Sequence, residues 1–153
     1  MRVRYRRDVT VQRLDHVGIV VEDIAAATAF FVELGLELQD EFEVAGNWVD
    51  RIVGLEGIQL EGAMLKTPDG NGLLEVVTFR APSGPNGDQH APPNTPGLRH
   101  LAFAVDDIEE VLARLQAHGA ELVGEVQNYE DAYVLCYLRG PEGIIVELTQ
   151  KLG

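Results

Sequence analysis

The sequence is poor in cysteine and in basic residues. Its single cysteine, Cys136, cannot form an intramolecular disulfide, which favours a reducing compartment, and we expect a cytoplasmic location. Lys and Arg number 12 against 25 Asp and Glu, and the formal net charge is −13. The one basic concentration, within residues 2–7, is too short to make a basic face. We therefore expect neither nucleic acid nor a membrane surface as a partner.

Long hydrophobic runs are also missing. No stretch approaches the roughly 20 apolar residues that cross a bilayer. The residues that follow the N-terminal arginines are interrupted by polar side chains, unlike a signal peptide. A chain of 153 residues with 46% hydrophobic residues can bury one good core. We therefore predict a single domain over residues 1–153.

An internal repeat organises this domain. Residues 14–24, LDHVGIVVEDI, reappear at 98–108 as LRHLAFAVDDI, at an offset of 84 positions (100 − 16). The same offset superposes Gly35 on Gly119. Self-similarity of this kind indicates two copies of one structural unit. We predict modules over about 10–80 and 97–151, joined by the Pro/Gly-rich linker 80–97, which can supply no hydrophobic face.

Each module has the pattern of a β-α-β-β-β unit, which predicts an α+β fold. The opening stretch alternates as a half-buried strand does. Asp23 and Asp107 are suitable helix N-caps, and Gly35 and Gly119 stand where a helix would end in a left-handed turn. The strands that follow are expected at about 37–45, 59–67 and 72–79, and at about 121–126, 132–139 and 144–150.

The first module carries an insertion that the second lacks. Within it, Trp48, Ile52 and Leu55 recur at helical spacing and predict a short helix or ordered loop. Packing in the core is the favoured role of these three side chains, over lining a pocket.

Four ionisable residues interrupt strands that should be apolar. His16 and His100 occupy the same phase of the two opening strands, and Glu75 and Glu147 lie within the two closing strands. A carboxylate in a half-buried strand costs several kcal/mol unless it is paired, hydrogen-bonded or bound to a metal. Each residue alone has an ordinary structural explanation, but each module contributes one His and one Glu.

A pseudo-twofold relation between the modules would bring the two imidazoles and two carboxylates together. This set suits one divalent ion such as Zn, Ni, Co, Mn or Fe. The small residues Gly18 and Ala102, next on the histidine face, would leave room for a substrate, although close packing explains them equally well.

With these motifs the chain resembles the vicinal oxygen chelate superfamily, which includes glyoxalase I, methylmalonyl-CoA epimerase, extradiol dioxygenases, and fosfomycin and bleomycin resistance proteins. The resemblance covers residues 13–150. It implies a U-shaped mixed sheet around a metal held by His16, Glu75, His100 and Glu147. It also implies a homodimer, whose sites lie either within one chain or between two exchanged chains.

The resemblance further suggests a reaction. A ligand set of two His and two Glu resembles that of glyoxalase I-like enzymes, and the epimerase resembles them with a glutamine in place of one Glu. We therefore expect a lyase or isomerase acting on a small-molecule substrate. By this resemblance, Glu147 is the mobile catalytic base and Glu75 its counterpart on the opposite face of the substrate. No glutathione signature is present, and the arginines that coenzyme A would require are dispersed.

Two other classes stay open. In an extradiol-type dioxygenase, Glu75 would only lie near the metal, and Fe(II) dependence with oxygen uptake would identify that class. In a metal-free binding protein of the bleomycin-resistance kind, the same concavity would sequester a cationic or aromatic ligand, which the negative charge suits.

Overall fold

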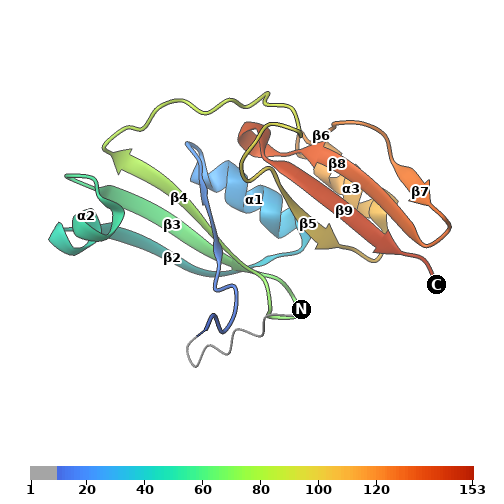
Figure 1. Ribbon diagram of the computed structural model, residues 1–153, viewed down its shortest axis with the longest axis horizontal. Helices are drawn as coiled ribbons and strands as arrows, with labels where there is room; N and C mark the ends of the chain where they lie inside the picture. Colours follow the sequence, from blue (N-terminus) through green and yellow to red (C-terminus); the bar gives the residue numbers. More distant parts are fainter. Residues whose placement is uncertain (1–9) are drawn as a thin grey trace, which may run out of the picture.

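A computed structural model describes residues 10–153 and contains two β-α-β-β-β modules (Figure 1). The first consists of β1 (Val17–Val20), α1 (Ile24–Leu34), β2 (Glu37–Ala45), α2 (Asn47–Val53), β3 (Gln59–Lys66) and β4 (Leu73–Ala81). The second consists of β5 (His100–Ala104), α3 (Ile108–Ala117), β6 (Glu121–Leu122), β7 (Gln127–Tyr129), β8 (Tyr133–Arg139), the 3-10 turn η1 (Pro141–Gly143) and β9 (Ile145–Lys151). The predicted α+β class is confirmed. The arginine-rich residues 2–7 lie outside the described residues.

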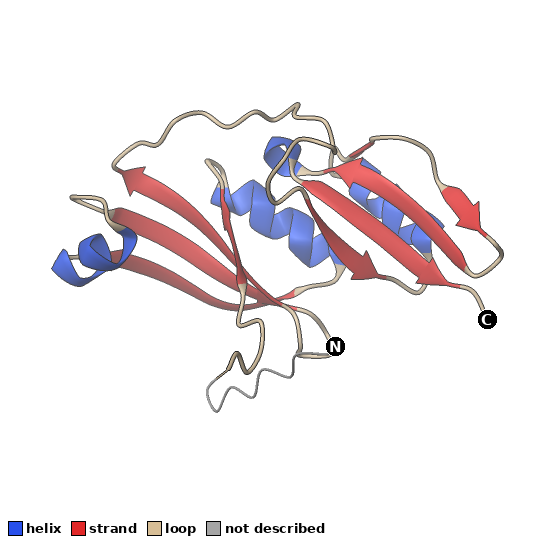
Figure 2. Cartoon of the chain, viewed as in Figure 1, coloured by secondary structure: helices blue, strands red, loops and turns tan. Residues whose placement is uncertain are grey.

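Each module forms its own mixed sheet. The first sheet has the strand order β1-β4-β3-β2 and the second β5-β9-β8-β6, with β7 paired to β8. The opening strand of each module is parallel to the closing strand, and the other pairings are antiparallel. The strand orders place β1 and β5 at the edges of their sheets, each with one paired neighbour among residues 10–153 (Figure 2).

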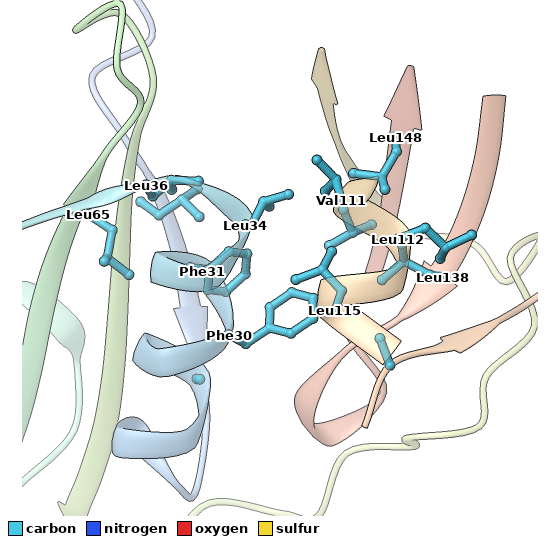
Figure 3. Close-up of a cluster of buried hydrophobic side chains, with 14 of the residues drawn as sticks. Phe30, Phe31, Leu34, Leu36, Leu65, Val111, Leu112, Leu115, Leu138 and Leu148 are labelled. Carbon is cyan, nitrogen blue, oxygen red and sulfur yellow. The ribbon is translucent and has the colours of Figure 1, made fainter. Parts of the chain in front are cut away.

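Helices α1 and α3 pack against each other between the two sheets (Figure 3). Phe30 and Phe31 of α1 and Leu115 of α3 are almost fully buried there, and Phe31 approaches Phe103 of β5. Burying side chains of this size stabilises the fold by about 1.5–3 kcal/mol each. Because the helices occupy the inner face of each sheet, the helix-free faces of the two sheets lie on the outside.

The helix ends follow the sequence signals. The Asp23 carboxylate accepts a hydrogen bond from the Ala26 amide, and Asp107 does the same for Glu110. Gly35 and Gly119 both have positive φ, at 124° and 89°, a conformation that glycine adopts without strain. No helix within residues 10–153 has the length and apolar character needed to cross a membrane.

The insertion in the first module forms α2, as predicted, but the expected core packing of Trp48, Ile52 and Leu55 is wrong. Leu55 is 44% exposed and lines a pocket. Trp48 is 59% exposed and Ile52 74% exposed, whereas Val49 is the buried residue of the helix. The Asp50 carboxylate accepts hydrogen bonds from the amides of Gly57 and Ile58, which ties the helix to the start of β3. The helical spacing thus predicted the helix correctly, but the residues assigned to its buried face lie on its exposed face.

The linker after β4 is mostly exposed, but it is hydrogen-bonded to the second module. Arg139 donates hydrogen bonds to the carbonyl oxygens of Gln89, at 3.4 Å, and Ala91, at 2.7 Å. Ala91 is buried, and a side chain at Gly143 would overlap the Gln89 carbonyl. The linker is therefore held against the turn between β8 and β9, which its composition did not predict.

Replacing Arg139 with Ala is expected to lower the free energy of unfolding by about 1.5–3 kcal/mol, because hydrogen bonds from a charged group are lost at partly buried carbonyls. Urea denaturation would measure the change. The matched control is His90→Ala, in the same linker, which should stay within about 0.5 kcal/mol of the parent because the side chain is exposed. Equal losses in both variants would contradict the anchoring role.

Candidate metal site

The first His–Glu pair lies on the helix-free face of the first sheet. Val17 and Ile19 pack against the core, so the alternation of β1 places His16 and Gly18 on the opposite face. Gly18 is the register partner of Glu75 on β4. The Nε2 atom of His16 lies 3.8 Å from a carboxylate oxygen of Glu75. His16 itself stands one residue before β1 and not within it.

The second pair repeats this arrangement on the other sheet. His100 begins β5, and Ala102, two residues on, is the register partner of Glu147 on β9. The His100 Nε2 atom lies 3.6 Å from a Glu147 carboxylate oxygen. In both modules, therefore, the residue two positions after the histidine stands opposite the glutamate.

Small residues stand beside both carboxylates: Gly18 leaves open space beside Glu75, and Ala102 beside Glu147 is exposed. A Cβ added at Gly18 would meet no atom within 4 Å, so close packing does not explain this glycine. The side chains of Glu75 and Glu147 are 32% and 22% exposed. Each pair thus has a side from which a small ligand could approach both carboxylate and imidazole.

Asp15 contacts His16 directly, a contact that the sequence analysis missed. One Asp15 oxygen lies 2.8 Å from the His16 Nδ1 atom, and the other accepts a hydrogen bond from Arg13 at 2.9 Å. The hydrogen bond with His16, followed by that from Arg13, lowers the pKa of the Asp15 carboxyl. An acidic residue immediately before the histidine was the available signal.

Tyr137 is a second residue that the sequence analysis missed. It stands opposite Glu147 in the β8–β9 register, and its ring centroid lies 4.9 Å from that of His100. Met64 holds the corresponding place opposite Glu75. The signal was the alternation along β8, since its neighbours Cys136 and Leu138 are buried in the core. The two His–Glu pairs, called half-sites below, therefore differ in the side chain beside the glutamate.

The donor set of each pair fits a divalent cation. The Asp15 carboxylate can only accept a hydrogen bond, so its contact places a proton on Nδ1 of His16. In the neutral ring, Nε2 then directs a lone pair towards the Glu75 carboxylate. Both facing atoms are electron-pair donors, and a cation between them would be bound by both. An imidazole and a carboxylate are both suitable ligands for the borderline and hard ions predicted above.

The two pairs do not meet within one chain. Among residues 10–153, no group of three or more His, Cys, Asp or Glu side chains is close enough to hold one ion. A cavity of about 940 Å³ lies between Leu55, Arg80, Glu142 and the linker, and it is lined by none of the four predicted ligands. The pairs instead occupy open sheet faces, one on each sheet.

Comparison with known proteins identifies the class to which this architecture belongs. Residues 15–137 match the Glyoxalase/Bleomycin resistance protein/Dioxygenase superfamily. The chain is a member of this superfamily.

Individual relatives agree with this assignment. A crystal structure of a glyoxalase family protein from Bacillus cereus is 44% identical, with a TM-score of 0.92, covering 95% of this chain and 98% of that one. The uncharacterized protein YaeR of Escherichia coli is 26% identical over 145 residues, covering 92% of this chain and 98% of its own.

The fold extends to more distant proteins. A point mutant of the fosfomycin resistance protein FosX from Listeria monocytogenes, complexed with Mn(II) and 1S,2S-dihydroxypropylphosphonic acid, has a TM-score of 0.59 at 15% identity, over 91% of this chain and 90% of that one. At this identity the likeness concerns the fold alone.

Proposed function

We propose that the protein is a divalent-metal-dependent enzyme that moves a proton next to a carbonyl group of a small substrate, with a lyase, isomerase or epimerase outcome. The observation that carries this proposal is the recurrence of one His–Glu pair, in one register, on the helix-free face of both sheets. The FosX mutant of the same fold is complexed with Mn(II), which supports the proposal of a divalent ion here.

The complete site in this proposal lies between two copies of the chain. Within residues 10–153, β1 and β5 each pair with a neighbouring strand on one side only. A twofold dimer with β1 beside β5 of the partner subunit would bring the His16–Glu75 pair of each chain next to the His100–Glu147 pair of the other. Leu14 and Leu98, at equivalent places two residues before each histidine, are 77% and 93% exposed. Apolar side chains this exposed beside both edges support a protein interface there.

Each residue of the proposed site has a role in binding the ion, moving the proton or shaping the substrate space. His16, Glu75, His100 and Glu147 would hold the ion, which when bound acts as a Lewis acid that polarises a substrate carbonyl. The Glu147 carboxylate takes the proton from the adjacent carbon, and Glu75 faces the substrate from the opposite side. Gly18 and Ala102 leave the substrate its space, and Tyr137 limits that space on the Glu147 side.

The first test is the metal content of protein purified without added metal. Elemental analysis should find about one ion per chain, since a dimer with two shared sites contains two complete ligand sets. His16→Ala and His100→Ala should each lose most of this metal, because each removes a ligand from every site.

The matched control is His118→Ala. The His118 Nε2 atom lies 3.6 Å from a carboxylate oxygen of Glu33, the same separation as in the His100–Glu147 pair, but at the contact between α1 and α3. This variant should keep the parental metal content. A chain that retains no ion after incubation with Zn, Ni, Co, Mn and Fe(II) would refute the proposal and favour a metal-free binding protein.

A further inference from the structure

The two histidines on the open sheet faces have different neighbours, although their modules repeat. The His16 ring is in contact with the Asp15 carboxylate at 2.8 Å through Nδ1. Arg99 occupies the place of Asp15 in the second module, and the ring of His100 lies against Tyr137 instead. No hydrogen bond to either ring nitrogen of His100 is found among the described residues. The repeat therefore carries a carboxylate behind one histidine only.

The geometry points to Asp15 as a positioning residue for His16, a role that rests on the proposed metal site. Its carboxylate holds the proton of the imidazole on Nδ1, which leaves Nε2 as the ligand atom and fixes the plane of the ring. A carboxylate behind a ligating histidine also makes the imidazole a stronger donor, and removing such a partner typically costs 10- to 100-fold in metal affinity.

Arg13 makes this contact more directional. It donates to the Asp15 oxygen that does not face His16, at 2.9 Å, so both carboxylate oxygens are engaged. An aspartate with one free oxygen could rotate away from the ring, and the contact with Arg13 opposes that rotation. The chain Arg13–Asp15–His16 thus ends at the Nε2 atom that faces Glu75.

The inference is tested first in the metal-free protein. Nitrogen-15 NMR of the imidazole rings, recorded above the pH range in which His titrates, should show His16 of the parent protonated at Nδ1. Asp15→Ala should shift His16 to a mixture of tautomers or to the Nε2-protonated form, and Asp15→Asn should fall between them, because a neutral amide accepts a weaker hydrogen bond. The His100 signals should not change.

The second measurement is the affinity for Zn(II) and Mn(II), by competition with a chromophoric chelator. Asp15→Ala should bind each ion about 10- to 100-fold more weakly than the parent. Asp88→Asn, the same chemical change as Asp15→Asn at an exposed linker position, should match the parent.

The outcomes separate this inference from the proposed function. If Asp15→Ala binds metal as tightly as the parent, or leaves the His16 tautomer unchanged, Asp15 is not a positioning residue and the metal site stands. If the tautomer changes as expected but the parent binds neither ion, the proposed metal site is wrong, and the positioning role falls with it.

Discussion

Exchange of a substrate α-proton with solvent should fall about 10²- to 10⁴-fold when Glu147 is replaced by Gln, since general-base catalysis contributes a factor of this size. The amide keeps the shape of the side chain and one coordinating oxygen but removes the charge and most of the basicity. Metal content should therefore fall only moderately. Deuterium uptake across a panel of 2-oxo aldehyde adducts and 2-methyl thioesters, with elemental analysis of the same samples, would measure both effects.

Two companion variants make this experiment selective. Glu33→Gln alters the carboxylate that faces His118, at the helix contact, and should leave proton exchange at the parental rate. Glu75→Gln reports on the opposite half of the site. Full exchange in a metal-loaded Glu147→Gln protein would show that Glu147 is not the base, and a loss confined to Glu75→Gln would move that role to Glu75.

The fold was largely predictable because its signals are local. An N-cap aspartate bonds an amide three residues away, and a glycine at a helix end needs only its own positive φ, so Asp23 and Gly35 could be read from their neighbours. The offset of 84 positions (100 − 16) predicted equivalent opening strands in the two modules, and the structure pairs Gly18 with Glu75 and Ala102 with Glu147 in them.

What the sequence did not predict depends on contacts across the fold. The amphipathic spacing of α2 is the same whether Trp48 faces the core or solvent, and only tertiary packing decides that it is exposed. The anchoring of the linker depends on Arg139, which is 48 residues from Ala91 in sequence. Composition predicted an exposed linker, and it cannot reveal a distant side chain that binds its carbonyl groups.

The sequence could name the residues of the two His–Glu pairs but not where the pairs lie relative to each other, and their role as metal ligands stays a prediction. A polar side chain in an apolar strand is visible in the sequence, which is why His16 and Glu147 could be named. Whether two equivalent sheets face each other depends on how α1 and α3 pack, and here the helices lie between the sheets. That packing separates the pairs within one chain and leads to the shared site that we propose.

Two variants that have each lost metal binding should therefore regain it when they form a mixed dimer. In a heterodimer of His16→Ala and His100→Ala chains, one shared site carries both substitutions and the other carries neither. Heterodimers isolated with two different affinity tags should hold about half the parental metal, because one of the two sites of the twofold dimer is intact. Each variant alone should hold almost none, so the expected change is from near zero to half occupancy.

A second heterodimer, with both substitutions in the same half-site, tests whether the recovery comes from a site shared between chains. Heterodimers of His16→Ala with Glu75→Ala should show no recovery, because both substitutions fall in the same half-site and each shared site then lacks one ligand. Recovery in the first mixture and not in the second requires that the two histidines of one site belong to different chains. If neither mixture recovers while both form stable heterodimers, the ion is not held between subunits, and a single chain would have to bring its two sheets together by a repacking of α1 against α3.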